Sequence, residues 1–123
     1  MEEACRRGDL NAVSELVRAN PKLVVRADGI GITPLHRAAA GNHLNLVRFL
    51  LSRGAEVNSV DKYLDTPLKK AAYGGHVGVV NELVLNGANI NHADQSGKLP
   101  LHHSAEQGQL QSVEILLDAR FFI

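Results

Sequence analysis

The sequence predicts an all-α repeat solenoid, in which stacked helix-turn-helix units carry short β-hairpin-like arms. The stretch "TPLHRAAAGNH" from Thr33 returns as "TPLKKAAYGGH" from Thr66 and as "LPLHHSAEQGQ" from Leu99, with a spacing of 33 residues both times. Such a fixed period is typical of repeat proteins. Of the 123 residues, 45% are hydrophobic but only 4% are aromatic, with no Trp, which favours thin stacked layers of Leu, Val, Ile and Ala.

The first helix of each period is expected to begin at the Thr-Pro pair. The hydroxyl of Thr33 can cap the helix, and Pro34 at the first helical position lacks only an N–H that would have no partner there. Asn42, Gly75 and Gly108 share one position after this helix. Both residue types tolerate positive φ, so the chain can end the helix there and reverse.

A second helix is expected to follow, because apolar residues recur at helical spacing in each period. The residues are Leu44, Val47, Leu50 and Leu51, then Val77, Val80, Leu83 and Val84, then Leu110, Val113, Leu116 and Leu117. We expect Leu50, Val80, Leu83 and Leu116 to be buried between layers. The alternating segments that follow end in turn residues such as "DQSG", which indicates an extended arm with a tight tip.

These motifs resemble ankyrin repeats, on "TPLHRAA", on "GGHVGVVNELVLNGANINHAD" and on the 33-residue period. The resemblance covers roughly residues 2–119 and implies a single domain, 1–123. Its units are an N-terminal partial repeat (1–27), two full repeats (28–60 and 61–93) and a C-terminal partial repeat (94–123). The N-terminal repeat has one extra residue in "NPKLVVRAD".

Three departures from the family pattern affect local structure. Leu64 stands where the other two tips carry Gly31 and Gly97, so we expect this turn to be reshaped to avoid positive φ. Lys69 replaces the motif histidine and Leu99 replaces the motif threonine, which weakens capping in two repeats.

The charge balance and the single cysteine limit the classes of function. Thirteen basic residues balance thirteen acidic ones, so no overall field favours nucleic acid, and no apolar run has the length of a signal peptide or membrane span. Cys5 aligns with Ala39, a small inward position, which favours a buried, inert thiol. We therefore expect a cytoplasmic or nuclear protein without membrane insertion.

The histidines leave one alternative open, a small metal-binding or enzymatic protein that uses His36, His43, His102 and His103. The repeat already explains four of the six histidines, and no CxxC, HExxH or phosphate-binding glycine motif occurs. We therefore predict no catalytic residue, no metal and no cofactor. A further alternative is a fragment of a larger ankyrin-containing signalling protein.

The resemblance implies a non-catalytic module that binds a partner protein through its arm tips and the concave face of the first helices, as adaptor or inhibitor. The candidate contacts are the positions where repeats differ. On the arms they are Ile30, Ile32, Lys62, Tyr63, Asp65, Gln95 and Lys98, and on the first helices they are Arg37, Lys70, Tyr73 and His103. Arg37, Lys70 and His103 recur at one position and form a basic row, which predicts a partner with an acidic or mixed segment. The competing interpretation is that all these side chains are merely solvated.

The C-terminal residues Phe121, Phe122 and Ile123 are three large apolar residues in a row. We expect this tail to fold back over the last repeat as a cap, because a solenoid needs a covered end. The rival expectation is weak self-association through that end.

Overall fold

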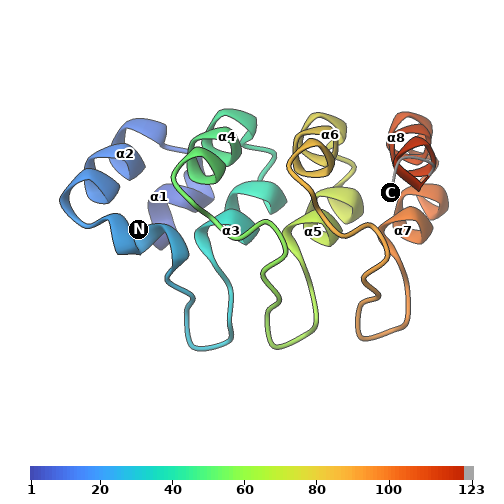
Figure 1. Cartoon of the computed structure of the whole chain (residues 1–123), viewed down its shortest axis with the longest axis horizontal. Helices are drawn as coiled ribbons and strands as arrows, with labels where there is room; N and C mark the ends of the chain where they lie inside the picture. The colour runs from blue at the N-terminus through green and yellow to red at the C-terminus, as the bar shows by residue number, and fades with distance from the viewer. Residues whose placement is uncertain (121–123) are drawn as a thin grey trace.

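The computed structural model describes residues 1–120, which form four helix-turn-helix pairs stacked side by side (Figure 1). The pairs are α1 (Glu2–Arg7) with α2 (Leu10–Ala19), α3 (Pro34–Ala40) with α4 (Leu44–Ser52), α5 (Pro67–Gly74) with α6 (Val77–Leu85), and α7 (Pro100–Glu106) with α8 (Leu110–Arg120). The predicted all-α repeat solenoid is confirmed. Phe121, Phe122 and Ile123 lie outside the described residues, and so do the expectations attached to them.

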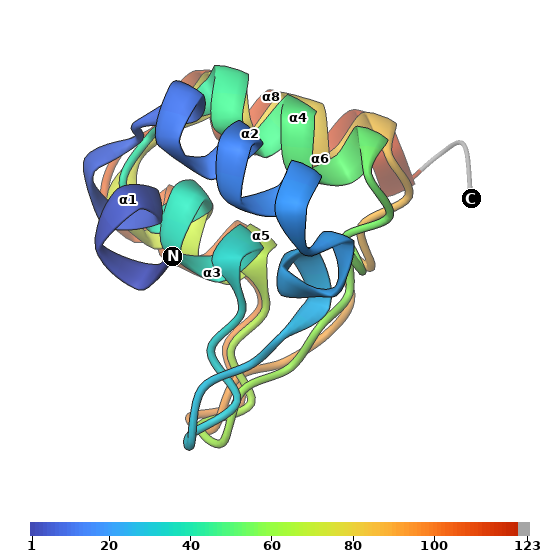
Figure 2. The same cartoon turned by 90° about the vertical axis from the view of Figure 1, so that its left-hand side faces the viewer.

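The helices form two layers, with the first helix of every pair in one layer and the second helix in the other (Figure 1). Viewed along the stack, the pairs nearly superimpose, and three arms project together from the layer of first helices (Figure 2). We call residues 26–33 arm 1, residues 53–66 arm 2 and residues 86–99 arm 3. All three arms therefore lie beside the first helices and away from the second ones.

The starts of the first helices follow the predicted capping. The Thr33 hydroxyl accepts a hydrogen bond from the His36 N–H at 3.2 Å, and the Thr66 hydroxyl accepts one from the Lys69 N–H at 3.1 Å. Leu99 has no side-chain acceptor, so the start of α7 lacks this bond, as its sequence predicts. The shared position after the first helices is left-handed in all three repeats, with φ of 62° at Asn42, 73° at Gly75 and 69° at Gly108.

The core is a continuous layer of aliphatic side chains between the stacked pairs. Leu50, Val80 and Leu83 are completely buried and Leu116 almost so, as predicted. At the two ends of the stack, Leu16 and Leu117 are exposed, although their counterparts within the stack are buried or half-buried. The Leu50 position of the second helix, which Leu16 occupies in the first pair, is therefore covered by the preceding repeat. The next position, that of Leu51 and Leu117, is covered by the following repeat.

The arms resemble hairpins in shape only, since no residue within 1–120 belongs to a β-strand. Arm 2 contacts arm 1 through one backbone hydrogen bond, from the Lys62 N–H to the Ile30 carbonyl at 2.9 Å. In the N-terminal repeat, the segment with the extra residue forms a 3₁₀ helix, η1 (Pro21–Val25), which begins at a proline and is capped by Asn20.

The expectation that the Leu64 turn avoids positive φ is wrong. Leu64 adopts a φ of 63°, like Gly31 at 84° and Gly97 at 78° in the other two arms. The cause is the hydrogen bonding of the turn, in which the Leu64 N–H donates to the Asp61 carbonyl at 3.0 Å. The N–H groups of Tyr63 and Asp65 also donate to Asp61 Oδ1, at 2.8 and 3.0 Å. Together these bonds offset the steric cost of a left-handed leucine, which is roughly 1–2 kcal/mol.

Truncating Leu83 to Ala is expected to lower the free energy of unfolding by about 2–5 kcal/mol, because a completely buried leucine leaves a cavity between repeats. Leu85→Ala is the matched control, since Leu85 lies in the same helix and is largely exposed. Urea denaturation of both variants measures the difference. Equal midpoints for Leu83→Ala and the wild type would show that the inward face of α6 is misassigned.

Replacing Leu64 by Gly is expected to raise the free energy of unfolding by up to about 1 kcal/mol, because the left-handed backbone is relieved. The reciprocal change, Gly97→Leu, should lower it by roughly 1–2 kcal/mol, since its φ is also positive and nothing lies within 4 Å of its missing Cβ. Thermal melts of the two variants test this. Changes of the same sign would contradict the strain assigned to Leu64.

Candidate protein-binding surface

Each arm is organised around one aspartate at the same position of the repeat. The Oδ1 atom of this aspartate accepts hydrogen bonds from the backbone N–H groups two and four residues further on. The donors are Ile30 and Ile32 for Asp28 at 2.9 Å each, Tyr63 and Asp65 for Asp61 at 2.8 and 3.0 Å, and Ser96 and Lys98 for Asp94 at 2.9 and 3.0 Å. The carboxylate therefore fixes the tight turn at the tip.

The second oxygen of each aspartate faces the basic row on the first helices. Arg37 Nη2 lies 2.7 Å from Asp28 Oδ2, and His103 Nε2 lies 2.8 Å from Asp94 Oδ2. Lys70 Nζ is 3.8 Å from Asp61 Oδ2. We call these three pairs the arm locks, because each joins an arm to the first helix that follows it.

The pKa values of two lock aspartates reflect these bonds. For Asp28, the backbone N–H of Ile32 lowers the pKa most, partial burial opposes this, and the Ile30 N–H and Arg37 lower it further. For Asp94, burial acts to raise the pKa. The hydrogen bonds from His103 and from the N–H groups of Lys98 and Ser96 outweigh it and hold the pKa at about 2.

The role that the sequence assigned to Arg37, Lys70 and His103 needs correction. They occupy equivalent positions, but each of these side chains already contacts an aspartate of its own repeat, and the three are only 16%, 27% and 11% exposed. The row therefore holds the arms in place, and it does not present unpaired charges to an acidic partner.

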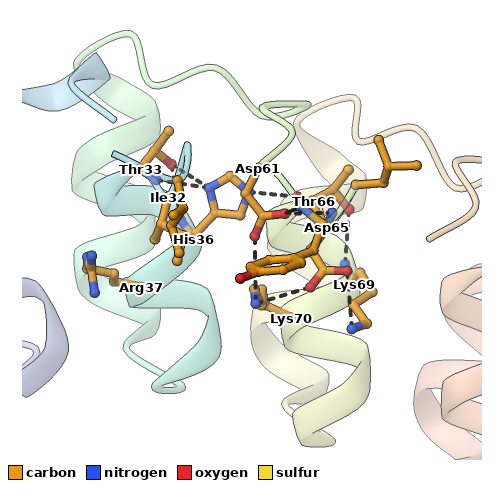
Figure 3. A network of polar contacts seen from close by, with 12 residues as sticks. Ile32, Thr33, His36, Arg37, Asp61, Asp65, Thr66, Lys69 and Lys70 are labelled. Atoms are coloured by element: carbon orange, nitrogen blue, oxygen red, sulfur yellow. Dashed lines mark hydrogen bonds and ion pairs between the residues drawn. The ribbon is translucent and has the colours of Figure 1, made fainter. Parts of the chain in front are cut away.

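The prediction that Asp65 contacts a partner from the arm also needs correction, because its carboxylate is buried (Figure 3). Its two oxygens lie 3.2 Å from Lys69 Nζ and 3.2 Å from Lys70 Nζ. Its backbone carbonyl lies 2.8 Å from His36 Nε2 in the preceding repeat. Asp65 thus belongs to the structural network between repeats.

His36 connects two repeats through both of its ring nitrogens (Figure 3). Nδ1 accepts from the Thr33 N–H at 3.1 Å, which assigns the proton to Nε2, where it is donated to the Asp65 carbonyl. Burial lowers the pKa of His36 below its usual 6.5 and outweighs the opposing effect of the bond to Asp65. The neutral ring is therefore the form that the fold uses.

Two further histidines bridge neighbouring repeats at the Gly-His position. His43 Nε2 lies 2.8 Å from the Arg6 carbonyl, and His76 Nε2 lies 2.9 Å from the Ala40 carbonyl. Residues 1–120 contain no group of three or more His, Cys, Asp or Glu side chains that could hold a metal ion. Cys5 is completely buried, as predicted, and this burial raises the pKa of its thiol.

The remaining candidates are exposed mainly in the repeat formed by arm 2 and α5. Tyr63 and Tyr73 are 45% and 60% exposed, and Leu64, which sequence reasoning did not select, is 46% exposed. Lys62 is exposed beside them. We call Lys62, Tyr63, Leu64 and Tyr73 the middle-repeat surface. A large apolar residue at a position that is glycine in the other arms was the sequence signal for Leu64.

Contacts around Tyr73 hold its ring in place while leaving one side in solvent. Lys69 Nζ lies 5.1 Å from the centre of the ring, and the His103 ring packs edge-on against it at 5.6 Å. In arms 1 and 3 the candidates are less prominent. Ile30 and Ile32 are half-buried, Lys98 pairs with Glu106 at 3.0 Å, and Gln95 is exposed.

Comparison with protein families supports the repeat assignment. The family model described as ankyrin repeats (many copies) matches residues 1–51, 35–83 and 70–117. These ranges cover almost the whole described chain, so the protein belongs to the ankyrin-repeat family. Proteins of this family bind other proteins through their stacked repeats.

Several curated relatives share part of this chain. Palmitoyltransferase AKR1 of Eremothecium gossypii is 45% identical over 58 residues, and that of Saccharomyces cerevisiae is 46% identical over 59 residues. The first match covers 45% of this chain and the second 46%, and each covers 8% of the relative. The chain thus matches only a small part of these relatives. Within residues 1–120, no helix combines the length and the apolar character needed to cross a membrane.

Acid is expected to weaken the lock of arm 3 through Asp94. Its pKa in the folded chain, about 2, is below the usual 3.8, so its contribution to stability is present above about pH 4 and is lost as the pH falls toward 2. Asp94→Asn should lower stability at pH 7 and reduce this acid-dependent loss. Urea denaturation at pH 7, 4 and 2 measures both effects.

Asp118→Asn serves as the control, because Asp118 is an exposed carboxylate on α8. It should leave the pH dependence of stability unchanged. Parallel stability curves for Asp94→Asn and the wild type would contradict the stabilising role assigned to the Asp94 carboxylate.

Proposed function

We propose that this ankyrin unit is a non-catalytic protein-binding module whose principal contact area is the middle-repeat surface. The observation that carries the proposal is the exposure of Tyr63, Leu64 and Tyr73 on the arm and first helix of one repeat. The other exposed large apolar side chain of that repeat, Leu85, lies on the second helix, away from the arms. Tyrosine is enriched at binding hot spots, because its ring supplies apolar area and its hydroxyl supplies a hydrogen bond.

The strained backbone at Leu64 supports the same surface. Glycine occupies this position in the other two arms and would fit the turn without strain. A leucine whose side chain is half in solvent gains little from burial within the chain. A residue that is locally unfavourable and yet exposed is consistent with a role in binding.

The partner is expected to carry an apolar group together with acidic or mixed polar residues. Lys62 is exposed and makes no ion pair within residues 1–120, so it is available to a carboxylate of the partner. In this proposal the unit acts as an adaptor or inhibitor in the cytoplasm or nucleus. The basic row contributes indirectly, because it holds the arms rigid and so lowers the entropy lost on binding.

The relatives bear on the protein to which this repeat unit belongs. We propose that this chain corresponds to the ankyrin part of a larger protein, as its match to 8% of Palmitoyltransferase AKR1 suggests. Acyl-transfer chemistry is not assigned to residues 1–120. The thiol of Cys5 is completely buried and its pKa is raised, which makes it a poor nucleophile.

Tyr63→Ala and Tyr73→Ala are each expected to weaken partner binding at least about tenfold, because truncation of a hot-spot tyrosine removes its buried contact area in the complex. Affinity capture from a native extract, followed by identification of the retained protein, supplies the partner. Calorimetric titration of that protein into each variant then gives the affinities.

Glu114→Ala is the matched control, since Glu114 is exposed on α8, in the layer away from the arms. It should bind as the wild type does. Lys70→Glu is not a clean test, because it would place a third carboxylate beside Asp61 and Asp65 and disturb the fold. Loss of binding in Glu114→Ala, with unchanged binding in the tyrosine variants, would assign the interface to the second helices.

A further inference from the structure

A hollow of about 170 Å³ opens between α1, η1, arm 1 and the start of α3. Its apolar wall includes Cys5, Leu23, Ile32 and Pro34. An engineered protein cavity of about 150 Å³ accepts benzene, so a hollow of this size accommodates one large aliphatic or aromatic side chain. None of the residues of the middle-repeat surface lines it.

The rim of the hollow carries two arginines in different situations. Arg26 is exposed and makes no ion pair with any residue in 1–120. Arg37 is held by Asp28 at 2.7 Å and has a second, looser contact with Glu2 at 3.8 Å. The Glu2 side chain is largely exposed, so this contact is weak. The rim therefore has room for one more carboxylate, next to Arg26.

The edge of arm 1 beside the hollow is open to another backbone. Arm 2 uses the Lys62 N–H to bond the Ile30 carbonyl of arm 1. The corresponding residue of arm 1 is Gly29, whose N–H has no hydrogen bond within residues 1–120. Nothing lies within 4 Å of the position that a Gly29 Cβ would occupy. An extended chain can thus lie along arm 1 and accept a hydrogen bond from the Gly29 N–H, just as arm 1 accepts one from the Lys62 N–H of arm 2.

We propose that this hollow is a second docking site, which binds an extended partner segment carrying one large apolar side chain next to an Asp or Glu. The apolar side chain enters the hollow, the carboxylate meets Arg26, and the backbone of the segment bonds the Gly29 N–H. The inference rests on the proposed protein-binding function, but it uses residues separate from the middle-repeat surface.

The test uses a phage-displayed library of random nine-residue peptides as the probe, selected on the immobilised full chain. The library is first depleted on Ala27→Leu, because Ala27 is exposed, lines the hollow and would partly fill it as leucine. Each enriched peptide should contain a large apolar residue and, within two positions of it, an Asp or Glu.

A synthetic copy of an enriched peptide is then titrated into variants of the full chain. Ala27→Leu and Arg26→Glu should each weaken binding at least tenfold. Glu2→Gln should strengthen it, because Glu2 lines the hollow and its negative charge repels the peptide carboxylate. Tyr63→Ala should bind the peptide as the wild type does. Far-UV circular dichroism checks that each variant is folded. If Ala27→Leu does not fold, Arg26→Glu still tests the site.

Three results would overturn the inference. They are an absence of enrichment, enriched peptides without the apolar-acidic pattern, and binding that neither Ala27→Leu nor Arg26→Glu weakens. If Tyr63→Ala is the one variant that weakens peptide binding, the middle-repeat surface is supported and the second site fails. If Tyr63→Ala leaves both the peptide and the captured partner unaffected, the proposed function fails independently of this site.

Discussion

In each arm, the two oxygens of one carboxylate perform different tasks. Oδ1 accepts two backbone N–H groups and shapes the tip, and Oδ2 faces a cation on the following first helix. The arm thereby has a fixed shape and a fixed position against the helices. A binding surface built from arm tips and first helices depends on that fixed position, because a mobile arm would lose more conformational entropy when a partner binds. The exposed Tyr63 and Tyr73 lie on the arm and on the first helix of one such repeat.

Neighbouring repeats are joined by a second set of bonds, made by histidine rings to backbone carbonyls. His36, His43 and His76 each reach a carbonyl of an adjacent repeat. Stability in such a stack is approximately the sum of the contributions of single repeats and of the interfaces between neighbours. The lock of arm 3 uses His103 where the other two locks use Arg37 and Lys70, and its contact with the aspartate, at 2.8 Å, is shorter than the 3.8 Å contact of Lys70.

The sequence predicted the fold well because its signals are periodic. Helix starts at Thr33 and Thr66, left-handed positions at Asn42 and Gly75, and the buried leucines all follow from residue type and spacing. The candidate site was predicted less well. The period aligned Asp28 with Asp61 and Asp94, and it aligned Arg37 with Lys70 and His103, but side-chain pairing between the two sets depends on how the arm folds against the helix. Spacing alone therefore could not show that these charges neutralise one another. The conformation of Leu64 was mispredicted for a related reason, since backbone bonds of the turn outweigh the preference of the residue.

The central claim is that the basic row stabilises the arms through the lock aspartates. A double-mutant cycle on the lock of arm 1, with Asp28→Ala, Arg37→Ala and the double variant, tests it most directly by chemical denaturation. The account predicts that the double variant loses clearly less stability than the sum of the two single losses, because either single change already breaks the pair. Additive losses would contradict the account and would return Arg37 to the set of free cations available to a partner.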